Sequence, residues 1–225
     1  MPMLLLALLL LLLARPAAAC NLALLFAVDV SGSVDHTEYR IQMEGLAHAL
    51  RHPPVADALV GGKAALAVVQ WTGASRQRLT VPWTSIESYP ALDAFAAATA
   101  DNPRVWRNFS TAIGEALRSA AAAFDDAPDC ARKLIDISGD GVSNEGLAPQ
   151  STRALMAERG ITVNALVIED ATADDLTGYF FESVITGPGA FVVTADGYAD
   201  YPDRIREKLL KEVIDIVSAL SPGDR

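Results

Sequence analysis

The feature that most constrains the fold is a series of short, nearly continuous apolar runs. Residues 22–28 carry only apolar side chains, and residues 64–71 and 161–168 are almost as apolar. A short run that is apolar at successive positions is typical of a strand buried on both faces of a sheet. Such strands occur mainly in parallel sheets that helices cover on both sides, so this pattern favours an α/β fold.

Segments with helical periodicity separate these runs. Met43, Leu46 and Leu50 recur on one face of residues 38–50, and Pro53 and Pro54 should end that helix. We expect further helices at residues 85–98, 111–124, 147–159, 173–181 and 201–220, and further strands at residues 77–81, 133–138 and 191–194. Strands that alternate with helices predict a doubly wound, mostly parallel sheet. Residues 20–225 contain no repeat or linker and are expected to form one domain.

The charge balance of the chain excludes several classes of function. The 225 residues include 18 Lys and Arg against 28 Asp and Glu, which gives a net charge of −10. Nucleic-acid binding needs clustered basic residues, so an acidic chain argues against it, whereas cation binding is compatible with it. Two cysteines exclude a four-cysteine zinc site.

The N-terminus has the pattern of an export signal. Residues 4–13 are almost entirely leucine, and Ala17 and Ala19 supply small residues for cleavage before Cys20. About ten apolar residues are too few to span a bilayer, and no later stretch is long enough to do so. We therefore predict a signal peptide at residues 1–19 and a periplasmic or secreted protein. An uncleaved N-terminal anchor and a lipoprotein anchored through Cys20 are the alternatives.

Polar residues follow the predicted strands where a ligand would bind. Asp29, Ser31 and Ser33 come directly after the first strand, Asp140 follows a later strand, and Thr111 begins a helix. Open parallel sheets bind ligands at the carboxyl ends of their strands. Two carboxylates and three hydroxyls are oxygen ligands, which suit Mg²⁺, with Mn²⁺ and Ca²⁺ as alternatives. Three neutral ligands would leave the ion electrophilic, so an acidic group of a partner could complete its coordination.

These residues resemble a known motif. The Asp29-x-Ser31-x-Ser33 sequence, with Thr111 and Asp140 downstream, is similar to the metal-ion-dependent adhesion site (MIDAS) of von Willebrand factor type A domains. The wider sequence resembles a bacterial family of exported A-domain-like proteins of unknown function, and the matching segments are residues 27–34, 111–114, 135–141 and 187–191. The resemblance implies the sheet order 3-2-1-4-5-6, a Mg²⁺ site at one sheet edge, and binding rather than catalysis. Residues 138–140 read Ser-Gly-Asp, where A domains more often have Thr-Asp-Gly.

Several readings of these residues stay open at this stage. We expect an exported, monomeric binding domain, not an enzyme, whose protein partner supplies a carboxylate to the ion. A metal-dependent hydrolase is the alternative, although His36 near the first motif lacks a second catalytic partner. A third possibility is a structural module in which the metal only orders the loops. Asp136 is expected to be a buried carboxylate below the metal, and Trp106 and Arg107 belong to a solvated loop or to a partner pocket.

The implied strand order also predicts a disulfide between Cys20 and Cys130. Cys20 precedes Asp29 by nine residues, and Cys130 precedes Asp140 by ten. Both aspartates should lie at the same edge of the sheet on neighbouring parallel strands. Strands rise about 3.3 Å per residue and lie about 4.8 Å apart, so equal distances back along the two strands reach the same opposite edge. That separation suits a disulfide, and export would provide an oxidising compartment.

Overall fold

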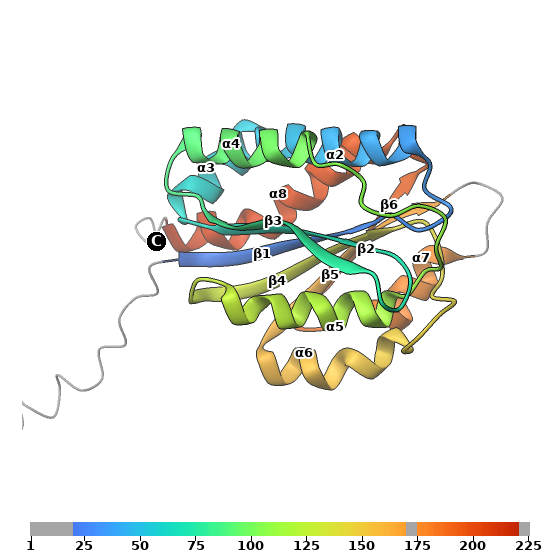
Figure 1. Cartoon of the computed structure of the whole chain (residues 1–225). Helices are drawn as coiled ribbons and strands as arrows, with labels where there is room; N and C mark the ends of the chain where they lie inside the picture. The colour runs from blue at the N-terminus through green and yellow to red at the C-terminus, as the bar shows by residue number, and fades with distance from the viewer. Residues whose placement is uncertain (1–19, 170–174, 221–225) are drawn as a thin grey trace, which may run out of the picture.

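The computed structural model describes residues 20–169 and 175–220, and side chains as far as residue 213. Its centre is a six-stranded sheet with the order β3-β2-β1-β4-β5-β6 (Figure 1). The strands are β1 (Cys20–Asp29), β2 (Ala65–Trp71), β3 (Gln77–Ser85), β4 (Cys130–Gly139), β5 (Ile161–Glu169) and β6 (Val192–Asp196). Only the β2–β3 pair is antiparallel among the described strand pairs. The predicted fold class and strand order are confirmed, whereas the predicted signal peptide lies outside the described residues.

Alternation along the strands divides the core into two layers. In β1, Leu22, Leu24 and Phe26 pack on one face of the sheet, and Ala23 and Leu25 pack on the other. The first face is covered by α2 (His36–Leu50), α3 (Pro53–Gly61), α4 (Tyr89–Ala100) and α8 (Tyr201–Leu220). The second face is covered by α5 (Ile113–Ala123), α6 (Arg153–Arg159) and α7 (Leu176–Tyr179), as Figure 1 shows. The shorter elements are η2 (Phe124–Asp126), η3 (Pro149–Thr152) and the π-helical η4 (Phe180–Val184).

Several helix boundaries differ from the predicted ones, and α5 begins at Ile113, so Thr111 lies just before the helix that it was expected to begin. Pro53 and Pro54 do follow the end of α2, but they also begin α3, because proline is tolerated in the first helical turn, where backbone N–H groups have no intrahelical partner. The helix expected at residues 85–98 begins at Tyr89, since β3 extends to Ser85 and the Ser88 hydroxyl caps the helix. The helix expected at residues 147–159 begins with the 3₁₀ turn η3.

The disulfide between Cys20 and Cys130 is present. The two residues are register partners at the first positions of β1 and β4, and their Cα atoms are 4.5 Å apart. The bridge joins the sheet edge opposite the carboxyl ends of these strands. The prediction from equal strand lengths is therefore confirmed. Within the described residues, no helix combines the length and the apolar composition needed to cross a bilayer.

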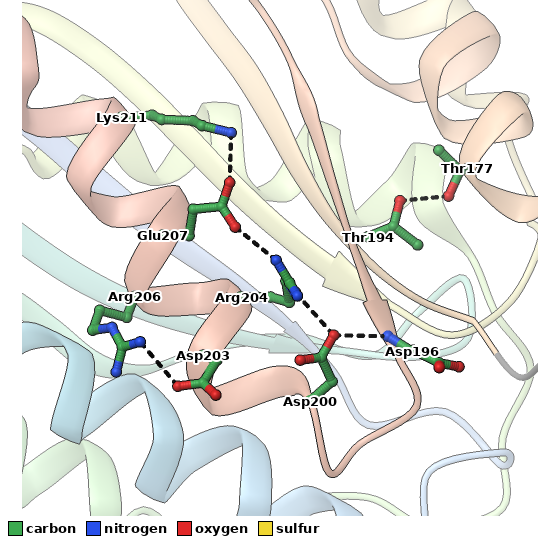
Figure 2. A network of polar contacts seen from close by, with 9 residues as sticks. All are labelled: Thr177, Thr194, Asp196, Asp200, Asp203, Arg204, Arg206, Glu207 and Lys211. Carbon is green, nitrogen blue, oxygen red and sulfur yellow. Dashed lines mark hydrogen bonds and ion pairs between the residues drawn. The ribbon is translucent and has the colours of Figure 1, made fainter.

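The exposed side of α8 carries a chain of ion pairs (Figure 2). Arg204 contacts Asp200 and Glu207 at 2.9 Å each, and Lys211 contacts Glu207 at 2.9 Å. Asp200 also accepts a hydrogen bond from the backbone N–H of Asp196 at the end of β6. Exposed pairs of this kind contribute at most about 1 kcal/mol each. They hold the start of α8 close to the end of β6.

Candidate metal site

The predicted oxygen ligands gather at the carboxyl edge of the sheet, on the right of Figure 1. Asp29 is the last residue of β1, and Asp140 follows directly after the neighbouring β4. Ser33 Oγ donates a hydrogen bond of 2.6 Å to Asp140 Oδ1, and the hydroxyls of Ser31 and Ser33 are 3.2 Å apart. Residues from two distant segments of the chain thus form one hydroxyl–carboxylate cluster.

The Asp29 carboxylate is the most unusual group of this cluster. Its Oδ1 accepts a hydrogen bond of 2.7 Å from the backbone N–H of Ser31, but its Oδ2 is buried and has no hydrogen-bond partner among the described residues. Burial, followed by repulsion from Asp140, raises the pKa of Asp29 to about 8. An unpaired buried oxygen is costly unless a cation or a donor meets it. This donor set therefore fits a hard divalent cation.

Thr111 lies beside the Asp140 loop. The segment that follows Asp140 folds back over it, because the Thr111 backbone N–H donates to Asn144 Oδ1 and the Thr111 carbonyl accepts from the Asn144 N–H, both at 2.9 Å. A Cβ built on Gly141 would lie 4.0 Å from Thr111 Oγ1. The Thr111 hydroxyl is therefore near the chain that carries Asp140, and the hydrogen bonds that hold Thr111 against Asn144 use its backbone.

Gly139 explains how β1 and β4 approach at this point. A Cβ at position 139 would lie 3.2 Å from Asp29 Oδ2 and 3.5 Å from Phe180 and Trp71 ring atoms. A larger side chain would therefore press on the buried carboxylate. The Ser138-Gly139-Asp140 sequence leaves space beside Asp29 in this way.

Two residues that contact the cluster were missed by the sequence reasoning. Tyr198 Oη, from the turn before α8, donates a hydrogen bond of 2.7 Å to Asp140 Oδ2. Burial and the adjacent Asp140 raise the pKa of Tyr198 well above its usual range, so the phenol stays a donor. Arg104 Nη2 donates to the carbonyls of Val30 and Ser31 at 3.1 and 2.9 Å and so holds the first turn. No local sequence motif marks either residue.

Asp136 lies apart from this cluster, within β4, as expected. It is buried, and its Oδ1 is 2.7 Å from Nζ of the fully buried Lys208 of α8. Lys208 also contacts Glu212, which accepts a hydrogen bond of 3.0 Å from Asn164 Nδ2. The carboxylate is thus held by an ion pair across the α8 interface. It is available neither to the metal cluster nor to solvent.

The cluster differs from a metal site built on histidine, cysteine or several carboxylates. In residues 20–169 and 175–220 no group of three or more His, Cys, Asp or Glu side chains is arranged to hold a metal ion. The candidate set has two carboxylates, Asp29 and Asp140, and depends on hydroxyls for the rest. That composition favours a cation that accepts neutral oxygen ligands.

Solved structures with a similar fold include several von Willebrand A proteins. Proximal thread matrix protein 1 from the mussel byssus matches with a TM-score of 0.63 and 20% identity over 89% of this chain and 48% of its own. A second structure of that protein, with a zinc-occupied MIDAS motif, matches with a TM-score of 0.58 and 19% identity over 89% and 49%. A von Willebrand factor type A protein from Catenulispora acidiphila matches with a TM-score of 0.56 and 18% identity over 86% and 43%. This chain spans about half the length of these proteins.

Sequence comparison assigns the family. No curated protein matches the sequence significantly. Residues 19–217 match the model of a family described as "Protein of unknown function (DUF1194)". That match covers nearly the whole described part of the chain, and the strand order and structural neighbours are those of von Willebrand A domains. The chain therefore belongs to the DUF1194 family and has the von Willebrand A fold.

Proposed function

We propose that this protein is a metal-dependent binding domain. The ion would be held by Asp29, Ser31, Ser33, Thr111 and Asp140. We propose that it is Mg²⁺, with Mn²⁺ and Ca²⁺ as alternatives. The observation that carries the proposal is Asp29 Oδ2, a buried carboxylate oxygen that no described residue meets with a hydrogen bond, beside a second carboxylate and two hydroxyls. A divalent cation would offset both the burial of this oxygen and the repulsion between Asp29 and Asp140.

The ligand set also suggests what the ion would do. Three of the five proposed ligands are neutral hydroxyls, which add no negative charge, so the bound ion would remain electrophilic. When bound, the ion would supply a Lewis-acidic docking point for a carboxylate of a protein partner. The zinc-occupied MIDAS motif of the mussel protein supports divalent cation binding by this fold.

Binding fits the cluster better than catalysis. A hydrolase would need a positioned base near the ion. His36 is the histidine that follows the first motif most closely, and among the described residues its ring has no hydrogen-bond partner to orient it. We therefore propose a binding protein and not an enzyme.

We also propose that the protein acts as a monomer outside the cytoplasm, after cleavage of residues 1–19. The Cys20–Cys130 disulfide supports this placement, because structural disulfides persist mainly in oxidising compartments. The bridge uses the first residue after the proposed cleavage point, which argues against a lipid on Cys20.

Calorimetric titration of the metal-stripped protein with Mg²⁺ tests the proposal. Asp29→Ala should abolish Mg²⁺ binding and keep a native circular dichroism spectrum. Asp126→Ala is the matched control, since this exposed aspartate lies between α5 and β4, just before the opposite sheet edge. Undiminished Mg²⁺ binding by Asp29→Ala would refute the ligand assignment.

Capture of partners from the exported fraction tests the docking role. Chelation and Asp140→Ala should each remove the captured protein to a similar extent. Equal capture with and without chelator would instead favour a structural role for the metal.

A further inference from the structure

The long loop between α4 and α5, residues 102–112, is held rigidly although it has no helix or strand. The buried Gln70 side chain accepts from the Val105 N–H and donates to the Pro103 carbonyl, both at 2.9 Å. Thr72 Oγ1 donates to the Ser110 carbonyl at 2.9 Å. Ordered loops of this length commonly carry function. The buried polar residues of β2 thus fix the position of the loop.

The same loop is attached to the first turn of the metal cluster. Arg104 donates to the carbonyls of Val30 and Ser31, and the Gly32 N–H donates to the Phe109 carbonyl at 2.8 Å. Asn108 adopts a left-handed conformation with φ of 57°, which is uncommon outside glycine and often found at functional sites. The loop therefore lies directly beside the proposed cation.

The loop exposes one aromatic and one cationic side chain, Phe109 and Arg107, whereas Trp106 is partly buried against the core. Phe109 is 37% exposed, and the Arg76 guanidinium lies 3.7 Å from its ring centroid. The Arg78 guanidinium lies 5.5 Å from the Trp106 ring centroid. Stacking of this kind orients guanidinium groups with little further loss of entropy on binding. Two arginines of the β2–β3 hairpin are thus held against the loop.

A cavity of about 370 Å³ lies on the other side of Arg104. Its lining includes His36 and five charged residues, Arg40, Arg104, Arg107, Glu44 and Asp101. Arg40 is paired with Glu44. Arg107 is exposed and forms no ion pair with any residue in the described part of the chain. The pKa of the Arg104 guanidinium is lowered mainly by burial and also by the nearby charge of Arg107. Since Glu44 is paired with Arg40, Asp101 is the remaining carboxylate among these lining residues, beside the two guanidinium groups of Arg104 and Arg107.

This concentration of arginine contrasts with the chain as a whole. The protein carries a net charge of −10, yet Arg76, Arg78, Arg104 and Arg107 gather around one loop. Glu145 lies beside Arg76, and Asp101 lines the same cavity as Arg104 and Arg107, so the positive charge that can attract an acidic segment is centred on the exposed Arg107. A long nucleic acid would extend beyond the loop, where the excess of acidic residues would repel its phosphates, so this charge distribution opposes nucleic-acid binding.

We propose that one surface of the protein, here called the arginine–aromatic surface, binds an acidic segment of the protein partner. This surface consists of Arg76, Arg104, Trp106, Arg107 and Phe109. One carboxylate of the segment would reach the cation, and further carboxylates would contact Arg107 and Arg104. Only the first of these contacts rests on the proposed metal-dependent function. The loop thus selects partners with several acidic residues over partners with one.

A fluorescein-labelled hexaglutamate peptide, followed by anisotropy at low salt in the presence of Mg²⁺, tests this surface. Arg107→Glu should weaken peptide binding about tenfold and Arg107→Ala by a smaller factor, because the exposed charge attracts the peptide at long range. The difference in peptide affinity between the wild type and Arg107→Glu should shrink at about 0.5 M NaCl, where exposed charges are screened. Arg118→Glu, an exposed arginine of α5 on the other face of the sheet, is the charge-matched control.

The outcomes separate this proposal from the metal-dependent function. Sensitivity to Arg107 that persists in chelator supports the arginine–aromatic surface even if docking through the metal fails. Equal effects of Arg107→Glu and Arg118→Glu would overturn the proposal, as would the absence of peptide binding at millimolar concentration. Tighter binding of oligothymidylate than of hexaglutamate would overturn the assignment to an acidic protein segment.

Discussion

Tyr198 Oη donates a hydrogen bond of 2.7 Å to Asp140 Oδ2, which joins the turn before α8 to the candidate metal site. Ser33 donates to the other oxygen of the same carboxylate at 2.6 Å. Both oxygens of Asp140 are thus oriented by the protein. Groups that orient a metal-ligating carboxylate commonly change metal affinity when they are removed.

Tyr198→Phe should therefore weaken Mg²⁺ binding by about tenfold or more while the fold is kept, because only one hydroxyl is lost. Calorimetric titration with Mg²⁺ measures the change. Tyr89→Phe is a matched control, since it deletes an exposed hydroxyl that also donates to an aspartate, Asp57, at 2.7 Å. Equal Mg²⁺ affinities of the two variants would contradict a positioning role for Tyr198.

Lys208→Met should destabilise the protein strongly. The substitution leaves Asp136 and Glu212 buried without their cation, and breaking a buried ion pair by removing one partner costs about 3–5 kcal/mol. Urea unfolding followed by circular dichroism measures the loss. Lys211→Met, on the exposed side of the same helix, removes an ion pair with Glu207 and should cost less than about 1 kcal/mol. Similar costs for the two variants would show that Lys208 does not act as a buried counter-ion.

Glu212 should make the stability of the protein depend on pH. Burial, aided by Asp136 and opposed by Lys208 and Asn164, raises the pKa of Glu212 from 4.5 to about 7. Between about pH 4.5 and 7 the folded state therefore holds a proton that the unfolded state releases. The stability that Glu212 contributes to the fold is lost as the pH rises through this range. Glu212→Gln should flatten the dependence of the unfolding free energy on pH in this range.

The comparison for Glu212→Gln is Glu207→Gln on the same helix. Glu207 is partly exposed, and its ion pairs lower its pKa, so Glu207→Gln should leave the slope between pH 4.5 and 7 in place. Urea unfolding at several pH values, in chelator, measures both variants. An unchanged slope in Glu212→Gln would contradict the prediction.

The Cys20–Cys130 bridge should contribute a large part of the stability. It closes a loop with a sequence separation of 110 residues, for which the entropic model gives roughly 4 to 5 kcal/mol. The double variant Cys20→Ser with Cys130→Ser should unfold at a correspondingly lower urea concentration. Reduction should shift the wild type to the same midpoint and leave the variant unchanged.

Intact-mass measurement of the exported protein provides an independent check of the bridge. A disulfide removes two hydrogens from the expected mass. An acylated N-terminus, or two thiols that react with an alkylating agent, would contradict the bridge in the native protein.

The buried strands followed from local patterns in the sequence, and the bridge followed from the positions of the cysteines on those strands once their order was known. Apolar runs mark buried strands because each side chain must leave water, and residues equally far from Asp29 and Asp140 reach the same edge because every strand rises by the same amount per residue. The resemblance to A domains supplied the order of the strands. Asp29, Ser31, Ser33 and Asp140 could be expected at one edge for the same reason.

Other features depend on the packing of distant segments. Tyr198 is 58 residues from Asp140 in the sequence, and Lys208 is 72 residues from Asp136. A tyrosine in a turn and a lysine in an amphipathic helix ordinarily face solvent, so their local sequence does not reveal these contacts.

The tertiary structure decides such contacts because a hydrogen bond or an ion pair forms only when the two groups come within about 3 Å in a suitable orientation. The docking of α8 against β4 and β5 sets that geometry for Lys208, and the turn before α8 sets it for Tyr198. The sequence by itself therefore determined the sheet, its carboxyl edge and the cysteine pair. Only the folded chain decided which side chains hold Asp140 and that Lys208 is buried against Asp136.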